Sequence, residues 1–465
     1  MKKLLLLMTS FLIGGVSFSQ FQVGHTTITY NDATRTGGFG SGGGAGRQIQ
    51  CEIYYPATST GDNTPIELSE FPVITFGHGF AMGWDAYSNI WEHLVPKGYI
   101  LIFPRTEGGL FPGPSHLDFG KDLVVVTNRF IQDCSTPGNF FEFRYNGKNA
   151  VMGHSMGGGA SFLGAAETTA PFDVIVGLAP AETNPLASTA AASVTIPALV
   201  LSGSSDAVTP PADHHQLIYD NLPTSSCLNF VTITGGAHCY FANSNFNCDF
   251  GESTSGGTIT IDRAEQQDIL FDVIDPYLAF YLKRECDEWT TFQNVLTTDT
   301  RIVVQDDCSY ELPVANQITA VGFNLSTTLP NPGLTIHWAF NGDTIPGATN
   351  TTFTITSTTY GNYFAVFTDE YGCQAASDPF PFNGSSTSIF ENENMSISFY
   401  PNPTTGIVTI LNTGEEKEAQ LVSIDGKIIQ TFLLKNNAQI NLSKLNSGVY
   451  FIQTETTTHI INKQN

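Results

Sequence analysis

A serine lies between two glycines at residues 153–157, in the run Gly-His-Ser-Met-Gly. A serine hydroxyl becomes a nucleophile when a base accepts its proton, and a sharp turn between a strand and a helix exposes such a hydroxyl. Glycines flank the serine in this turn because a side chain there would have no room. The residues before the motif are apolar and those after it are small, which predicts a strand followed by a helix. Ser155 is therefore a candidate nucleophile.

A nucleophilic serine requires a base, and the base requires an acid that orients it. Around a strand–serine–helix turn the three residues follow in the order serine, acid, histidine. Asp206 ends the run "IPALVLSGSSD", and His238 ends the run "NFVTITGGAH". Because the carboxyl ends of parallel strands meet at one edge of a sheet, we expect Ser155, Asp206 and His238 to form a catalytic triad there. Taken singly, Asp206 could instead cap the following helix, and His238 could be a hydrogen-bonded turn residue.

Four further histidines lie near these residues in the sequence and are expected to stay outside the chemistry. His214 and His215 begin the helix expected after Asp206, where they are predicted to face solvent. His78 precedes a glycine and is expected to shape a turn. His154, inside the serine motif, is assigned no role.

Cleavage of an ester passes through an oxyanion, which two backbone amides can stabilise. One donor is expected from Met156, directly after the candidate nucleophile, and the other from the loop after the run "FPVITFG". Phe80 lies in that loop, in "HGFAMGW", and is the second candidate donor; simple packing of Phe80 in the core is the alternative. The side chains of Phe80, Met156 and Trp84 would give an apolar floor for the acyl group.

The elements that must position these side chains follow from the pattern of apolar runs over residues 21–308. The strand candidates are "FPVITFGHGF", "GYILIFPR", "NAVMGHS", "FDVIVGLAP", "IPALVLSGSSD" and "NFVTITGGAH". Near-continuous apolar strands separated by amphipathic helices indicate a mostly parallel sheet covered on both faces. The expected fold class of this domain is α/β, doubly wound, with a kink at Pro276 in its last helix.

The amino-acid composition of the chain changes after residue 308. Residues 309–382 are rich in Thr and aromatic residues, and the segments around Trp338, "TIPGATN" and "YGNYFAVFTDEYGC" resemble an immunoglobulin-like β-sandwich of secreted bacterial proteins. Residues 383–396 are polar and predict a linker. In residues 397–465 the blocks "PNP", "DGK" and "SGVYF" resemble, in that order, the C-terminal sorting domain of the type IX secretion system of Bacteroidetes. That resemblance implies a small all-β domain with the secretion machinery as its partner.

Composition limits the location and the partners. The chain of 465 residues has 19 Lys and Arg against 43 Asp and Glu, a formal net charge of −24, so nucleic acid is not an expected partner. Residues 1–20 combine two lysines, an apolar run and small residues, the pattern of a secretory signal peptide. We therefore expect a secreted or cell-surface protein that crosses the periplasm by the type IX system and has a monomeric catalytic domain.

Eight cysteines fit an exported protein in which disulfides form. The pairings expected are Cys239 with Cys248 and Cys286 with Cys308, because each would close a short loop, although connectivity cannot be read from a sequence. No pair has the CxxC spacing of a zinc site, so neither a metal nor another cofactor is expected.

Five segments follow one another between residues 30 and 285: "GGGAGRQIQCEIYYPA", "FGHGFAMGW", "GHSMGGGAS", "SGSSDAVTPP" and "GGAHCYF". In this order they resemble the dienelactone-hydrolase-like and cutinase-like polyester hydrolases, including the bacterial PETases, which have the α/β-hydrolase fold. The resemblance implies Ser155 as nucleophile, His238 as base and Asp206 as its partner. It also implies Phe80 and Met156 as the oxyanion donors.

Two positions depart from the pattern of that family. Its members usually carry Tyr where Phe80 stands, and Trp in the loop where this chain has Ala181. Ala181 is therefore a candidate substrate contact at which an aromatic clamp is missing. The change leaves ester chemistry intact and bears on whether poly(ethylene terephthalate), PET, is a substrate.

The function expected from these observations is a secreted serine carboxylic-ester hydrolase that acts on polyesters through an acyl-enzyme. A lipase, a small-ester esterase and a carbohydrate esterase share the same triad and remain alternatives, which only the pocket can distinguish. An alternative of another class is a non-catalytic surface adhesin whose hydrolase domain is a scaffold. The complete serine, acid and histidine set disfavours that alternative, while the fold alone does not decide the substrate.

Overall fold

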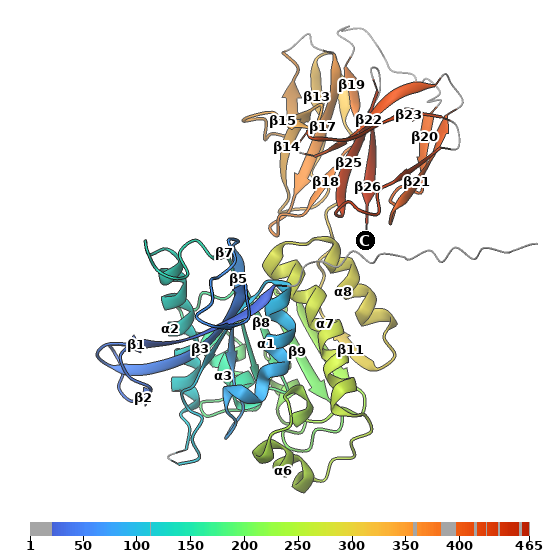
Figure 1. Ribbon diagram of the computed structural model, residues 1–465. Coiled ribbons are helices and arrows are strands. Elements are labelled where there is room, and N and C mark those ends of the chain that lie inside the picture. Colours follow the sequence, from blue (N-terminus) through green and yellow to red (C-terminus); the bar gives the residue numbers. More distant parts are fainter. Residues whose placement is uncertain are drawn as a thin grey trace, which may run out of the picture. The chain divides into compact units, whose positions relative to one another are not determined.

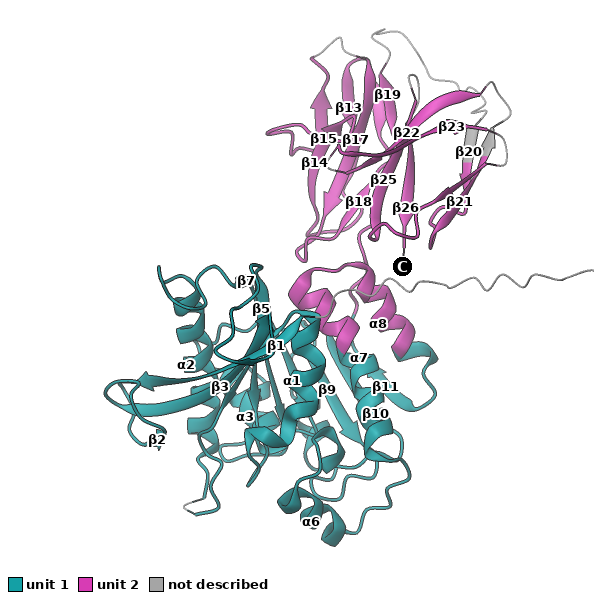
Figure 2. Cartoon of the chain, viewed as in Figure 1, with its two compact units in different colours: residues 1–274, 296–308 teal, residues 275–295, 309–465 magenta. Residues whose placement is uncertain are grey.

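The structure is a computed structural model and describes residues 21–464, apart from 112, 357–359, 383–396, 413–415, 425, 436–437 and 455–457. The predicted signal peptide, residues 1–20, and the predicted linker, residues 383–396, lie outside the described residues. Two compact units are present (Figure 2). Unit 1 holds the described residues up to Ile274 together with Leu296–Cys308; unit 2 holds Asp275–Val295 and the described residues from Ser309 onward.

Unit 1 is built on a single mixed sheet (Figure 1). Strands β5 to β10 run parallel in its centre, and antiparallel strands extend it at both sides. In spatial order the strands are β11 (Ile302–Asp306), β10 (Leu228–Ile233), β9 (Ala198–Gly203), β8 (Val174–Leu178), β7 (Tyr145–His154), β5 (Phe71–Gly77), β6 (Ile100–Pro104), β3 (Arg47–Ala57), β1 (Gln22–Asp32) and β4 (Gly61–Asp62), with β2 (Gly38–Phe39) beside β3.

The parallel strands coincide with the apolar runs of the sequence. Strands β5, β6, β8 and β9 are buried along their whole length, as expected of strands covered on both faces. The predicted α/β doubly wound sheet is thereby confirmed for unit 1.

Helices and short 3₁₀ turns connect these strands, and α1 and α7 cross in front of the central strands in Figure 1. They are η1 (Trp84–Tyr87), α1 (Ser88–Leu94), η2 (Val95–Lys97), α2 (His116–Cys134), α3 (Met156–Ala165), α4 (Ala187–Ala191), α5 (His215–Asp220), η3 (Cys239–Phe241), α6 (Phe246–Ser255) and α7 (Arg263–Lys283). Helix α7 carries Pro276 in its interior, as the sequence indicated. None of the described helices has the length and apolar character needed to cross a membrane.

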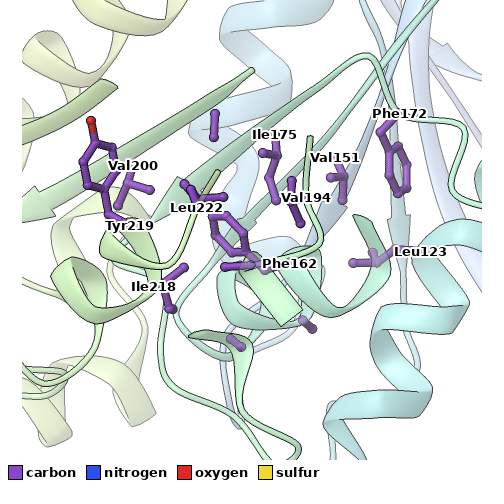
Figure 3. Packing of buried hydrophobic residues seen from close by; sticks show 14 of the residues in the cluster. Leu123, Val151, Phe162, Phe172, Ile175, Val194, Val200, Ile218, Tyr219 and Leu222 are labelled. Carbon is purple, nitrogen blue, oxygen red and sulfur yellow. The ribbon is translucent and has the colours of Figure 1, made fainter. Parts of the chain in front are cut away.

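The core beside the candidate nucleophile is apolar and closely packed (Figure 3). Phe162 on α3 packs with Val151 on β7 and Ile175 on β8, all of them fully buried. This packing fixes α3 against the strands from which the serine turn emerges. Burial of side chains of this size stabilises the fold by about 1.5–3 kcal/mol each.

Unit 2 consists of α8 (Asp287–Thr298, of which it holds the part to Val295), the last turns of α7 and four small sheets. One pair of sheets buries Trp338 and Phe367 between them, the β-sandwich expected from the sequence. Its strands are β12 (Thr319–Val321), β13 (Asn324–Ser326) and β16 (Thr352–Thr354) in one sheet, and β15 (Asp343–Thr344), β14 (Thr335–Phe340), β17 (Gly361–Thr368), β18 (Gln374–Ala376) and β19 (Phe380–Phe382) in the other.

The last part of the chain forms a second pair of sheets with its own apolar core. One sheet comprises β20 (Ile397–Tyr400), β21 (Ile407–Asn412) and β24 (Gln439–Asn441). The other comprises β23 (Ile428–Leu434), β22 (Lys417–Ser423), β25 (Gly448–Gln453) and β26 (Thr458–Lys463). All of its described elements are strands, in agreement with the all-β domain expected for residues 397–465.

Three disulfides are present among the described residues. Cys239 pairs with Cys248, as predicted. The predicted pairing of Cys286 with Cys308 is wrong: Cys308 pairs with Cys227, and Cys286 pairs with Cys373.

The strand register explains the first of these unexpected pairs. Strand β10 begins at Leu228, directly after Cys227, and pairs antiparallel with β11, so that Asn229 faces Asp306 and brings Cys308 beside Cys227.

The second unexpected pair lies within unit 2. Cys286, between α7 and α8, is joined to Cys373, which lies between β17 and β18. Rings from α7, α8 and the β-sandwich meet next to it: Tyr277, Phe280, Tyr281, Trp289, Phe292, Tyr310 and Tyr371. The catalytic domain predicted to end at residue 308 thus contains a helical segment, 275–295, that groups with the β-rich unit.

Candidate active site

Ser155 sits at the turn between β7 and α3, as the sequence predicts. Its backbone has φ 54° and ψ −122°, a conformation that is costly for a residue with a Cβ atom. The flanking glycines are required by close packing: a Cβ on Gly153 would lie 2.3 Å from the carbonyl oxygen of Gly157, and one on Gly157 would lie 2.1 Å from that of Gly77. The turn therefore has the strained geometry of a nucleophile elbow.

Backbone hydrogen bonds hold this strained turn. The amide of Ser155 donates to the carbonyl of Leu178 at 3.0 Å, and the Ser155 carbonyl accepts from the amides of Gly159 at 3.0 Å and Ala181 at 2.9 Å. Ala181 therefore lies directly beside the serine turn, in the loop after β8. A role for its side chain in substrate binding stays a prediction.

Asp206 and His238 are brought together in unit 1, each from the loop that follows a parallel strand. His238 Nδ1 lies 2.7 Å from Asp206 Oδ2, and both side chains are buried. The other carboxylate oxygen, Asp206 Oδ1, accepts from the amides of Val208 at 2.9 Å and Thr209 at 2.8 Å. Burial alone would raise the pKa of Asp206, but the hydrogen bond from His238 and these amides hold it below its ordinary value. Asp206 is thus an ionised, oriented partner for the imidazole.

Two polar residues that the sequence did not indicate complete this cluster. Thr209 Oγ1 lies 3.0 Å from Asp206 Oδ2, 2.9 Å from His215 Nε2 and 2.8 Å from His238 Nδ1. The prediction that His215 faces solvent is wrong: its side chain is fully buried, with Nδ1 2.8 Å from Ser202 Oγ. Burial lowers the pKa of His215 to about 3, so this imidazole is neutral. The segment Asp-Ala-Val-Thr, a side chain–backbone turn pattern, is the signal that could have revealed Thr209.

Asp206, His215 and His238 place three potential metal ligands within 4.8 Å of one another. The Thr209 hydroxyl lies within hydrogen-bonding distance of all three side chains. A cation bound between these ligands, about 2.0–2.2 Å from each, would take the place of that hydroxyl. The donor set therefore fits a hydrogen-bonded imidazole–carboxylate pair and does not fit a metal ion.

Phe80 and Met156, the predicted oxyanion donors, lie in the loop after β5 and at the first position of α3. The Phe80 side chain is 50% exposed, which excludes the alternative of core packing. Met156 is buried in the apolar core behind the turn. The next residue in the loop, Ala81, has φ 56°, and its carbonyl accepts from Asn247 Nδ2 at 2.7 Å. Helix α6 thus holds the loop that carries Phe80.

Trp84, the third predicted contact to substrate, belongs to an aromatic group at the β1–β3 side of the sheet. Its ring lies 6.4 Å from that of His25, 6.0 Å from Tyr54 and 5.6 Å from Trp91. A substrate-binding role for Trp84 stays a prediction.

The remaining two histidines are buried next to the site. The ring nitrogens of His78 lie 3.0 Å from the Gly79 carbonyl and 2.9 Å from the Thr106 carbonyl, so His78 shapes the turn as predicted. His154, which was assigned no role, lies fully buried with Nε2 3.0 Å from the carbonyl of His238.

Helix α6 follows closely after His238 and carries two exposed aromatic side chains. Phe246 is 82% exposed and Phe250 is 61% exposed, with ring centroids 6.2 Å apart. The helix is fixed by the disulfide between Cys239 and Cys248 and by the Glu252 carboxylate, which accepts from the Cys239 amide at 2.6 Å. The exposed rings are therefore held by a rigid element.

The family model described as PET hydrolase-like matches residues 16–254, just over half of the chain. The chain belongs to the PET hydrolase-like family. The matched range contains the serine turn, the Asp206–His238 pair and most of α6.

Two curated relatives align with this part of the PET hydrolase-like chain. A bis(hydroxyethyl) terephthalate hydrolase of Streptomyces coelicolor is 25% identical over 244 residues, which are 52% of this chain and 64% of that protein. Cutinase 2 of Thermobifida cellulosilytica is 26% identical over 216 residues, 46% of this chain and 72% of that protein. The chain thus spans less than two thirds of the Streptomyces protein.

A shorter match involves a plant protein. Chlorophyllase-2 of Arabidopsis thaliana is 32% identical over 106 residues, 21% of this chain and 30% of that protein.

The C-terminal part of the chain matches a second family model, the secretion system C-terminal sorting domain, over residues 398–464. The PET hydrolase-like chain therefore carries an address for export by the type IX system to the cell surface or beyond, as the sequence predicted.

Proposed function

We propose that this protein is a serine carboxylic-ester hydrolase that cleaves polyesters through an acyl-enzyme. The observation that carries the proposal is the buried pair of His238 and Asp206, 2.7 Å apart, in the same unit as a serine on a strained strand–helix turn. The relatives named as a terephthalate ester hydrolase and a cutinase support carboxylic esters as the substrate class.

The proposed reaction begins with attack of Ser155 Oγ on the ester carbonyl carbon, while His238 Nε2 takes the hydroxyl proton. The tetrahedral intermediate collapses, the C–O bond to the alcohol breaks, and the imidazolium of His238 protonates the leaving alkoxide. A water molecule then attacks the acyl carbon of the acyl-enzyme, giving up its proton to His238. The second tetrahedral intermediate then collapses: the bond between the acyl carbon and Ser155 Oγ breaks, the acid leaves, and the imidazolium of His238 returns its proton to Oγ.

Asp206 supports this cycle from the other side of the imidazole. A carboxylate at Nδ1 keeps the tautomer in which Nε2 is free to accept a proton, and it stabilises the imidazolium that forms. Hydrogen bonds from Val208, Thr209 and His238 keep this carboxylate ionised although it is buried.

The oxyanion of the intermediate is proposed to accept from the amides of Met156 and Phe80. Met156 is the first residue of α3, where the unpaired amides and the helix dipole favour negative charge. The Phe80 loop is fixed by the bond from Asn247 to the next carbonyl.

Exposed apolar side chains support a polymeric, uncharged substrate. The segments that follow β5, β6, β8 and β10, including helix α6, carry exposed apolar residues, namely Phe80, Leu110, Phe111, Leu186, Phe246 and Phe250. Single exposed apolar residues are ordinary, but their recurrence on several connections at one edge of a sheet is typical of a binding surface. The net charge of −24 disfavours anionic substrates.

A second candidate function is a small-ester or carbohydrate esterase. The observation in its favour is Ala181, whose amide touches the serine turn and whose side chain offers no ring to hold an aromatic acid.

The test compares two substrates on the purified full chain, with Ser155→Ala as the blank. We expect hydrolysis of p-nitrophenyl butyrate and release of acid from a polyester film, both abolished in the blank. Ester turnover without film products would favour the second candidate. Turnover in the blank equal to that of the wild type would overturn both.

A further inference from the structure

Tyr87, at the end of η1, connects two parts of the proposed site through its hydroxyl group. The Gly79 amide, directly before Phe80, donates to Tyr87 Oη at 2.8 Å. Tyr87 Oη lies 2.9 Å from His154 Nδ1, and His154 Nε2 lies 3.0 Å from the carbonyl of His238. These three hydrogen bonds join the loop that carries Phe80, here called the oxyanion loop, to His154, the residue before the proposed nucleophile, and to His238, the proposed base.

The bonds have one consistent direction. The His238 carbonyl can only accept, so His154 Nε2 carries the hydrogen and Nδ1 is the acceptor for the Tyr87 hydroxyl. This requires a neutral imidazole, and burial, together with the nearby His238, lowers the pKa of His154 well below its ordinary value. The Met82 sulfur, 3.3 Å from Tyr87 Oη, is the weaker acceptor for that hydroxyl.

The network is enclosed by the protein. Tyr87 and His154 are fully buried, and the ring of Tyr87 packs 4.7 Å from that of Phe76 on β5. A Cβ on Gly79 would lie 3.1 Å from Tyr87 Oη and 3.3 Å from His154 Nδ1, so the network fills the space where a side chain at residue 79 would stand. A displacement of the backbone at Gly79, His154 or His238 would break a hydrogen bond of this network, and water cannot easily replace that bond.

We propose that Tyr87 and His154 are positioning residues that fix the oxyanion loop and the His238 loop relative to the Ser155 turn. The inference rests on the proposed function, since it assigns these residues to the same site. The hydrogen bonds of these side chains go to each other, to the Gly79 amide and to the His238 carbonyl, and the ring of His154 also packs 4.8 Å from that of His238. They act because ester attack tolerates little error in the placement of a donor amide or a base.

Three variants each remove a different hydrogen bond or set of hydrogen bonds from the network. Tyr87→Phe removes the hydroxyl and leaves the Gly79 amide and His154 Nδ1 unpaired. His154→Asn keeps a polar atom near Nδ1 and loses the bond to His238, whereas His154→Gln keeps a donor near Nε2 and loses the bond to Tyr87. Tyr55→Phe is the matched control, because Tyr55, on β3, is also buried and its hydroxyl donates to the Thr64 carbonyl at 2.9 Å.

For Tyr87→Phe we expect kcat for p-nitrophenyl butyrate to fall about 10- to 100-fold, with KM within about twofold. His154→Asn should lower kcat with KM within about twofold, because it frees the His238 loop. His154→Gln should weaken binding of a phenylboronic acid, which forms a tetrahedral adduct with the serine. Tyr55→Phe should also lower the thermal stability while keeping wild-type kcat.

Equal kcat in Tyr87→Phe and Tyr55→Phe would overturn the proposal, as would a loss of activity in the His154 variants that only follows their melting temperatures. The two His154 variants decide the matter if Tyr87→Phe does not fold. Failure of the proposed function has a different signature, namely a wild type that hydrolyses no more ester than Ser155→Ala.

Discussion

Unit 1 buries imidazoles and carboxylates in hydrogen-bonded sets, whereas the interior of unit 2 is mainly aromatic and aliphatic. The buried ionisable acids and histidines of unit 1 are Glu52, His78, Asp122, His154, Asp206, His215, His238 and Glu252. Among the described residues of unit 2, the buried polar side chains are those of Thr327, Asn362, Ser377, Thr404, Thr458 and Lys463.

The difference distinguishes the unit that holds the candidate active site from the unit that holds the sorting domain. Burial of an ionisable group costs several kcal/mol unless partners compensate, so each such group needs hydrogen-bonding or charged partners. Asp206 illustrates this, since its two oxygens accept from His238 and from the amides of Val208 and Thr209. Unit 2 buries no acid or histidine among its described residues and carries the sorting domain.

The largest expected effect is the loss of this buried carboxylate. Asp206→Asn should lower kcat for p-nitrophenyl butyrate by about 10³- to 10⁴-fold, because the amide no longer fixes the tautomer of His238. Asp213→Asn, an exposed acid a few residues away, is the control and should keep wild-type kcat. Retention of kcat within tenfold in Asp206→Asn would contradict the role of the pair.

Removal of the two exposed rings of α6 tests whether unit 1 also holds the polymer. Phe246→Ala combined with Phe250→Ala should reduce acid release from a polyester film about tenfold, because apolar contact area next to the site is lost. Hydrolysis of p-nitrophenyl acetate should stay within about twofold, since so small an ester does not reach α6. Phe143→Ala, which removes a ring that is 68% exposed just before β7 at the opposite edge of the sheet, is the control. Equal film activity in the double variant and the control would exclude α6 from substrate binding.

The neutral, buried His215 of unit 1 predicts a pH-dependent contribution to the stability of that unit. The unfolded chain protonates His215 below pH 6.5, whereas the folded unit resists protonation down to a pKa of about 3. Stability is therefore lost as the pH falls through this window, by about 1.4 kcal/mol per pH unit from this group. His215→Asn, which keeps a polar atom near Ser202, should flatten that slope. Hydrogen exchange of the β9 amides at pH 4, 5 and 6.5 measures it; an unchanged slope in the variant would refute the assignment.

The smallest expected effect on activity comes from the disulfide of unit 2. Cys286→Ser with Cys373→Ser should lower the free energy of unfolding of unit 2 by about 2–4 kcal/mol and leave kcat/KM unchanged. The matched comparison is Cys239→Ser with Cys248→Ser, which frees α6 beside His238 and should lower kcat/KM. An equal loss of kcat/KM in the two double variants would contradict the assignment of the ester chemistry to unit 1 alone.

Much of the candidate site could be predicted because it depends on local pattern. The serine turn, the positions of Asp206 and His238 after apolar strands, and the open loop of Phe80 each have a signal within a dozen residues. The parallel strands were equally readable, since burial on both faces leaves continuous apolar runs.

The features that were missed depend on contacts distant in sequence. His215 lies in a polar segment, and only Ser202 and Thr209 make its burial favourable. The shortest loop predicts Cys286 as the partner of Cys308, yet loop-closure entropy changes slowly with length, and the strand register places Cys227 beside Cys308. His154 could not be assigned because its partners, Tyr87 and His238, come from two other loops.

The most direct test of the central claim is to map the covalent adduct that forms when the purified full chain reacts with an organophosphate such as diisopropyl fluorophosphate. We predict one adduct per chain, on Ser155 by peptide mass spectrometry, with loss of ester hydrolysis in proportion to labelling and a strongly slowed reaction in Asp206→Asn. Labelling of another residue, or full ester hydrolysis in a chain labelled at Ser155, would contradict the claim that the serine turn of unit 1 carries the chemistry.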